Sequence, residues 1–252
     1  MTIVERLREF LENPPHDEDG EPCATELLPP LKSEEIAAWE ARIGAPLSPE
    51  CRELVNFCGG LKEGPMELIE FAGGDVDFLP FPALDKRMTH IAPDGFGNFW
   101  FFWTTAVTSD LGPIYYFQHE GPMVFYQSPR LVDFVEECLR FMTPPFKCLV
   151  DDVHEFRLKP IRDLNKDLIE REAAIASGDE ELRAFASAQP AESRLYDFRR
   201  AKVGDGVDLK HLELTAAHPN LPILAFIRGR GPFARWLLGR RDIKFRKTSA
   251  KR

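Results

Sequence analysis

Residues 91–127 read IAPDGFGNFWFFWTTAVTSDLGPIYYFQHEGPMVFYQ, and this stretch decides the fold that the sequence predicts. Phe99–Thr105 and Ile114–His119 are rich in aromatic and β-branched residues, which suit the half-buried pleated surface of a strand. A third run, Met123–Gln127, follows the turn signal Glu120-Gly121-Pro122. No nucleophile, metal cluster or phosphate-binding loop accompanies these runs in the sequence. The stretch therefore predicts a sheet built to hold a surface, and it favours binding over catalysis.

Helix signals lie on both sides of this stretch. Residues 2–12 place apolar side chains at helical spacing. Two further helices are predicted over residues 33–43 and 48–58, each opening with a serine as its N-cap. After the strands, Ser128 is predicted to cap a helix that continues to residue 142. This order predicts an α+β fold, an antiparallel sheet with helices packed on one face.

Charge is divided unevenly along the chain. Residues 1–150 carry 11 Lys and Arg against 25 Asp and Glu, a net charge of −14. Residues 151–252 carry 21 against 16, a net charge of +5, and ten of these basic residues fall in residues 228–252. An acidic body suits a basic partner, although acidic surfaces also serve solubility alone.

The chain also changes character near residue 149. Beyond this point the sequence predicts a helix pair, Asp163–Ser177 and Asp179–Ala188, followed by short strands and the basic tail. We therefore expect two domains, residues 1–149 and residues 150–252, the second a mixed α/β extension of unknown type.

The amino-terminal segment and the cysteines bear on the cellular compartment. Met1–Asn13 is charged throughout and lacks the apolar centre of a signal peptide. No apolar run approaches the roughly 20 residues that a membrane span needs. The five cysteines are odd in number and lack CxxC spacing, as expected for buried thiols in a reducing compartment. The sequence thus predicts a cytoplasmic protein without a membrane partner.

Four segments of the N-terminal half, in this order and spacing, resemble the SUKH superfamily, which includes bacterial toxin-immunity proteins and a fungal cell-wall-synthesis regulator. They are Leu28–Ile36, Trp39–Leu47, Pro49–Leu54 with Gly59-Gly60, and Ile91–Asn98 before an aromatic strand. The helix after Ser128 fits the closing helix of that family. The resemblance covers roughly residues 28–142 and leaves the first 27 residues, Gly73–Asp85 and the last hundred residues outside the pattern. It implies an α+β fold and protein binding, most often as the inhibitor of a secreted toxin.

The aromatic strands supply candidate partner-binding residues. Alternation sends Phe99, Phe101 and Trp103 to one face of the sheet and Trp100 and Phe102 to the other, so both faces are apolar. Aromatic residues dominate interface energies, and an acidic rim speeds association with a basic partner. The candidate centre is Trp100, Tyr115, Tyr116 and Tyr126, and the candidate rim is Asp75, Asp77, Asp85 and Asp94. The alternative is that one face packs under the helices and the other under the C-terminal half.

No catalytic site, metal site or cofactor is predicted. His119-Glu120 and His154-Glu155 lack the second histidine of HExxH, and Gly95-x-Gly97 lacks the third glycine of a dinucleotide site. Asp75-x-Asp77 has no second acidic cluster to complete an oxygen cage. His90, His119 and Asp94 are interpreted as a structural trio across the hairpin. The basic tract in residues 228–252 is expected to be solvated or to dock on the acidic half, so nucleic acid is not an expected partner.

The leading hypothesis is an immunity protein, not an enzyme, that binds a cognate bacterial toxin with a basic surface and occludes its active site or substrate groove. A non-enzymatic scaffold or regulatory interaction protein is the first alternative. An enzyme carried by the C-terminal half is the second.

Overall fold

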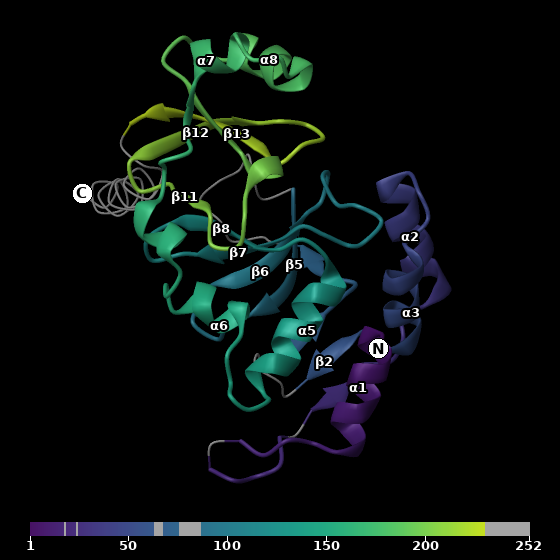
Figure 1. Ribbon diagram of the computed structural model, residues 1–252. Helices are drawn as coiled ribbons and strands as arrows, with labels where there is room; N and C mark the ends of the chain where they lie inside the picture. The colour runs from purple at the N-terminus through teal and green to yellow at the C-terminus, as the bar shows by residue number, and fades with distance from the viewer. Residues whose placement is uncertain (18, 24, 63–67, 76–86, 230–252) are drawn as a thin grey trace, which may run out of the picture.

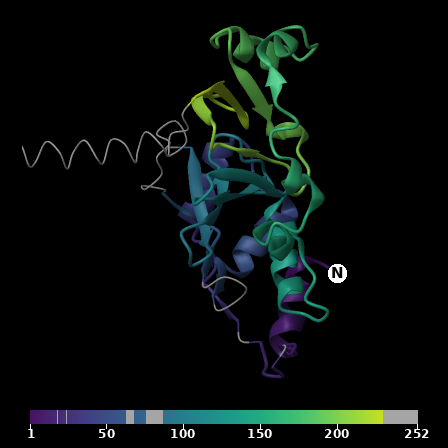
Figure 2. The ribbon, with the colours of Figure 1, turned by 90° about the vertical axis from the view of Figure 1, so that its left-hand side faces the viewer.

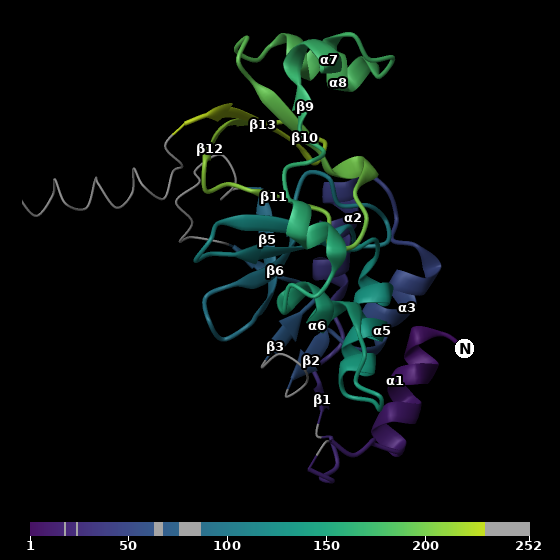
Figure 3. The same cartoon turned by 60° about the vertical axis from the view of Figure 1, so that its left-hand side comes forward.

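A six-stranded antiparallel sheet lies at the centre of the structure, a computed structural model that describes the chain except residues 18, 24, 63–67, 76–86 and 230–252 (Figure 1). Across this central sheet the strands are β11 (Gly206–Asp208), β8 (Met123–Ser128), β7 (Ile114–Gln118), β6 (Phe99–Trp103), β5 (Met88–Pro93) and β4 (Gly74–Asp75). A second sheet has the order β12 (Leu212–Ala217), β13 (Ile223–Arg228), β10 (Arg194–Asp197) and β9 (Ile169–Glu170). A small third sheet contains β1 (Glu26–Leu27), β2 (Gly60–Lys62) and β3 (Leu68–Glu70) (Figure 3).

The helices pack against these sheets in layers. They are α1 (Ile3–Glu12), α2 (Ser33–Ile43), α3 (Pro49–Phe57), α5 (Leu131–Phe141), α6 (Leu149–His154), α7 (Arg171–Ile175) and α8 (Glu180–Ser187), with the 3-10 turns η1 (Lys159–Asp163) and η2 (Phe198–Arg200). From top to bottom in Figures 1 and 2, α7 and α8 lie over the second sheet, the second sheet over the central sheet, and the central sheet over α5 and α6. Helices and antiparallel sheets are thus segregated, and the predicted α+β fold is confirmed.

Local sequence explains where the first helices begin and end. The Thr2 hydroxyl accepts from the Glu5 backbone N–H while the Glu5 carboxylate accepts from the Thr2 N–H, which forms a capping box for α1. Ser48 caps α3 through the backbone N–H of Cys51, as predicted. Gly44 ends α2 in the left-handed conformation, with a φ of 75°, which glycine adopts without steric cost.

Two predicted N-caps are shifted in the structure. Helix α2 begins at Ser33, and Lys32 takes the cap position, where its backbone N–H donates to the Glu35 carboxylate. Ser128 does not cap α5, because it is the last residue of β8 and pairs with Ile114. The cap of α5 is Arg130, whose guanidinium binds the carboxylate of Asp133 in the first turn. Strand pairing therefore continues one residue beyond the predicted end at Gln127, and the cap of α5 lies two residues after Ser128.

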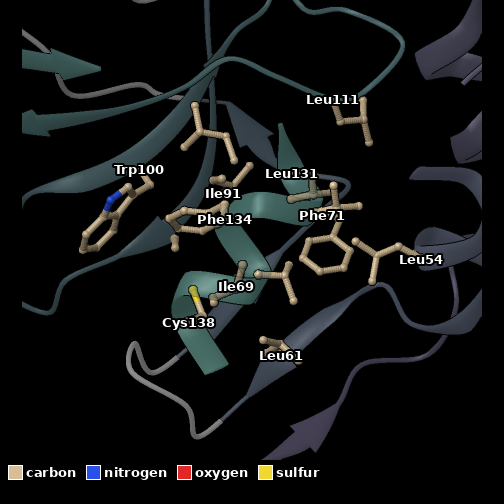
Figure 4. Packing of buried hydrophobic residues seen from close by; sticks show 14 of the residues in the cluster. Leu54, Leu61, Ile69, Phe71, Ile91, Trp100, Leu111, Leu131, Phe134 and Cys138 are labelled. Atoms are coloured by element: carbon tan, nitrogen blue, oxygen red, sulfur yellow. The ribbon is translucent and has the colours of Figure 1, made fainter. Parts of the chain in front are cut away.

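The first core lies between the central sheet and the N-terminal helices. Strands β6 and β7 pair in the register Trp100↔Tyr116, and these side chains point toward the helices. Phe134 of α5 packs on Trp100 with ring centroids 6.2 Å apart (Figure 4). Trp39 of α2 meets Phe102 edge-on at 5.5 Å. This face of the sheet is buried, as aromatic side chains of this size require.

The second core covers the opposite face of the same strands. Phe101 and Trp103 of β6 and Tyr115 of β7 are buried there together with side chains from the second sheet and η2. The ring of Phe198 meets Tyr115 edge-on at 5.2 Å. Phe226 of β13 belongs to the same cluster. Both faces of the aromatic strands are therefore interior, which is the alternative that the alternation pattern left open.

The expected boundary near residue 149 falls inside these shared cores. Strand β11 pairs with β8, so the C-terminal half supplies an edge strand of the central sheet. Val150 and Val153 of α6 are buried in the first core. The change in composition and charge at this point is a feature of the sequence, while the hydrophobic interior runs through both halves.

Strands and helices of the C-terminal half differ in part from the prediction. The first helix of the predicted pair, Asp163–Ser177, is limited to α7, because residues 164–167 form turns and β9 occupies Ile169–Glu170. The sequence predicts strands that lie within a few residues of the observed β12 and β13, but it predicts no strand at β10 or β11. Residues 230–252 of the basic tract lie outside the described residues.

Neighbouring tyrosines of β7 give opposite predictions for stability. The Tyr115 hydroxyl has no hydrogen-bond partner among the described residues of the second core, whereas the Tyr116 hydroxyl donates to Asp94 at 3.2 Å. An unpaired buried polar group costs about 1–3 kcal/mol. We expect Tyr115→Phe to leave the free energy of unfolding unchanged or to raise it, and Tyr116→Phe to lower it by about 1–3 kcal/mol. Urea denaturation measures both, and equal losses in the two variants would contradict the two-core arrangement.

Candidate functional site

The predicted aromatic centre is not an exposed surface. Trp100, Tyr115 and Tyr116 are at most 2% exposed, and Tyr126 is partly buried against the second core. The prediction that these four residues form a binding face is corrected for the folded chain, because the helices cover one side of the sheet and the second sheet covers the other.

The structure also differs from the predicted acidic rim. The Asp94 side chain is only 2% exposed, so it does not belong to a solvated rim. The backbone of Asp75 lies in β4, while its side chain and the whole of Asp77 and Asp85 lie outside the described residues. The structure therefore places one of the four rim residues, and it places it in the interior.

Asp94 organises the turn between β5 and β6. Its carboxylate accepts hydrogen bonds from the backbone N–H groups of Phe96, at 2.8 Å, and Asn98, at 3.0 Å. It also accepts from the side-chain amide of Asn98 and from the Tyr116 hydroxyl. Gly95 and Gly97 have φ values of 80° and 94°, which L side chains rarely adopt, so the turn depends on both glycines.

The ionisation of Asp94 follows from these contacts. Burial alone would raise the pKa of its carboxyl, since desolvation disfavours the charged form. The hydrogen bonds from Asn98, from the Phe96 N–H and from His154 together outweigh burial, and the pKa of Asp94 is lowered. The turn therefore encloses a carboxylate that is ionised at neutral pH.

Two other elements brace the same turn from outside. The His154 ring of α6 approaches the Asp94 carboxylate with its Nε2 at 3.3 Å and stacks on Trp100 at an interplanar angle of 22°. On the other side, the backbone N–H of His119 donates to the Asn98 side chain at 2.9 Å. The histidine that reaches Asp94 is thus His154, not His90 or His119 as the expected trio had it.

This bracing holds an aromatic side chain in solvent. Phe96, at the tip of the turn, is 78% exposed, far more than any aromatic residue of the strands. His119, which binds Asn98 of the turn, is followed by the exposed Glu120, and His154, which binds Asp94, is followed by the exposed Glu155 and Phe156. We call Phe96, His119, Glu120, Glu155 and Phe156 the Phe96 surface. Sequence reasoning found the turn but missed Phe96, although an aromatic residue between two glycines is a local signal for exposure.

The Asp94 carboxylate is committed to holding the turn, and burial raises the pKa of the thiols of Cys51, to about 12, and of Cys58 and Cys148, to about 11. Within the described ranges no group of three or more His, Cys, Asp or Glu side chains is arranged to hold a metal ion. The same ranges contain no helix long and apolar enough to cross a membrane.

Comparisons with protein-family models, with curated proteins and with solved structures give no match to this chain. The resemblance to the SUKH superfamily stays an expectation that rests on the four segments in residues 28–142.

Asp94→Asn tests the role of the carboxylate. At neutral pH we expect it to lower the free energy of unfolding by about 1.5–3 kcal/mol, the range for hydrogen bonds to a charged group. Because the pKa of Asp94 is lowered by folding, its contribution is present above the ordinary value of 3.8 and is lost as pH falls through the folded-state value. The difference in the free energy of unfolding between wild type and Asp94→Asn should therefore narrow as pH falls below 3.8.

Urea denaturation at neutral pH and in acid measures this difference. Glu155→Gln, an exposed acid beside the same turn, is the matched control and should change stability by less than about 0.5 kcal/mol at neutral pH. If the difference in the free energy of unfolding between wild type and Asp94→Asn stays constant from neutral to acidic pH, the carboxylate charge does not stabilise the turn.

Proposed function

We propose that this chain is a cytoplasmic immunity protein that neutralises a cognate bacterial toxin by occluding its active site or substrate groove, and that the Phe96 surface is the contact. The observation that carries the proposal is the 78% exposed Phe96 on a turn braced from three sides. The resemblance of residues 28–142 to the SUKH superfamily supplies the class of partner.

Rigidity is what suits Phe96 to be an interface anchor. A binding residue that is already held in one geometry loses little conformational entropy on association. The Asp94 carboxylate holds the backbone of this turn in one geometry. The Tyr116 hydroxyl and the His154 ring hold the carboxylate itself. Aromatic side chains at the centre of an interface commonly carry most of its binding energy.

Charge indicates the kind of partner. Glu155 pairs with His154, which binds Asp94 of the turn. Glu120 follows His119, which binds Asn98 of the same turn. Residues 1–150 as a whole carry a net charge of −14. Acidic groups around an apolar anchor complement a basic surface with an apolar pocket, and they speed the encounter at low salt. Toxins that act on nucleic acids carry such basic grooves, and an acidic inhibitor competes with the substrate there.

A scaffold or regulatory interaction protein is the second candidate, and the same surface supports it. A rigid exposed aromatic residue suits any protein partner, whatever that partner does. The two candidates differ in whether loss of the contact exposes the cell to a toxin.

Phe96→Ala tests the proposal in cells that express a cognate toxin. We expect the variant to fold like wild type, because the side chain is exposed, and to lose about 2 kcal/mol of binding energy, roughly thirtyfold in affinity, mainly through faster dissociation. Binding kinetics with purified toxin and survival of the cells measure the loss. Leu11→Ala, an exposed apolar residue on α1, is the matched control. Unchanged dissociation and full protection by Phe96→Ala would remove this surface from the interface.

A further inference from the structure

A groove of about 830 Å³ lies in the C-terminal half, far along the chain from the Phe96 surface. Its volume is in the range of roughly 300–1,000 Å³ that is usual for small-molecule sites. Two chain segments form its walls, residues 160–173 and residues 196–205. Both walls meet where β9 pairs with β10, a ladder that covers only Arg194 and Leu195 of β10.

Polar contacts hold the two segments together. Lys166 of the first wall lies 3.8 Å from the Asp205 carboxylate of the second. Beside the lining, Asn165 exchanges two hydrogen bonds with the backbone of Asp208, at 3.0 and 3.2 Å. A groove of this volume between two connected walls suits a compact ligand.

Tyr196 contributes an unpaired hydroxyl to this groove. The residue is only 3% exposed, and its ring packs on Phe198 at 4.5 Å. Its hydroxyl has no hydrogen-bond partner among the described residues, and it is not enclosed within the core. Burial, and then the charges of Asp205 and Asp167, raise the pKa of Tyr196, so the phenol keeps its proton at neutral pH. A neutral phenol in this position offers a donor to a ligand.

Each acidic side chain of the lining already has a partner, either a basic side chain or a backbone N–H. Asp205 accepts from the Lys202 N–H and lies near Lys166, Asp167 lies 4.0 Å from Lys166, Glu170 pairs with Arg194, and Asp197 pairs with Arg199. The side chains of Arg200 and Lys202 are exposed and form no ion pair within 4 Å among the described residues, although the Arg200 charge helps to lower the pKa of Asp179. The uncommitted polar groups of the groove are therefore donors: a phenol, a guanidinium and an ammonium.

We propose that this groove binds a compact organic anion, an apolar body that bears a carboxylate or a phosphate. Tyr196 would donate a hydrogen bond to it, Arg200 and Lys202 would balance its charge, and the apolar body would lie against Leu168, Ile169 and Ala201 of the lining. This site lies on other residues than the proposed toxin contact, and it is independent of that function.

Four probes that share one aromatic body test the charge preference. They are 1-naphthoate, 1-naphthyl phosphate, neutral 1-naphthol and cationic 1-naphthylmethylamine, each titrated into the full chain by calorimetry. We expect the better of the two anions to bind at least about tenfold more tightly than 1-naphthol and the amine, a difference of about 1.4 kcal/mol. Comparison of the two anions distinguishes a carboxylate site from a phosphate site. Equal binding of charged and neutral probes, or no saturable binding of either anion, would overturn the proposal.

Variants place the binding in the groove. Arg200→Gln with Lys202→Gln should weaken the preferred anion at least about tenfold and leave 1-naphthol unchanged. Tyr196→Phe should weaken the anion without loss of thermal stability, because the hydroxyl makes no internal hydrogen bond. Arg183→Gln with Lys210→Gln removes two exposed cations outside the lining and is the matched control. Retention of wild-type anion affinity by the first two variants, or an equal loss in the control, would contradict the assignment.

Discussion

Two apolar faces on one sheet are the constraint on which this structure depends. Strands β6 and β7 carry large aromatic residues at successive positions, so alternation cannot leave either face to solvent. Each aromatic side chain removes about 150–250 Å² from water when buried, which makes exposure of such a face costly. The chain meets this requirement with two layers, the N-terminal helices on one side and the second sheet on the other.

This constraint moves recognition from the sheet to its turns. Once both faces are interior, the aromatic residues of β6 and β7 define the position of the turns at the ends of these strands, among them the turn between β5 and β6, and side chains at that turn meet solvent. Asp94 shows the coupling: its carboxylate is buried against Tyr116 and His154, and it holds the backbone of Phe96, the most exposed phenylalanine among the described residues. An acid that was expected on an exposed rim is thus an interior group that holds a turn.

The sequence could predict elements that short-range chemistry determines. Ser48 and Pro49 give the start of α3, and the aromatic runs give β6, β7 and β8 to within two residues. Strands β10 and β11 were missed because they are short, and their pairing with β13 and β8 is decided by residues far away in the chain. The turn at Asp94 was predictable, whereas its burial depends on His154, sixty residues later, which no local pattern reveals.

Native-state hydrogen exchange tests most directly whether the central sheet is interior on both faces. If the two halves share their cores, the amides of β6 and β7 and those of β13 should open with the same free energy, within about 1 kcal/mol, in one global unfolding event. Exchange of the β13 amides at a much lower free energy, with β6 and β7 still protected, would show that the second sheet leaves the aromatic face intact. That result would contradict the account and return the aromatic face to the list of binding surfaces.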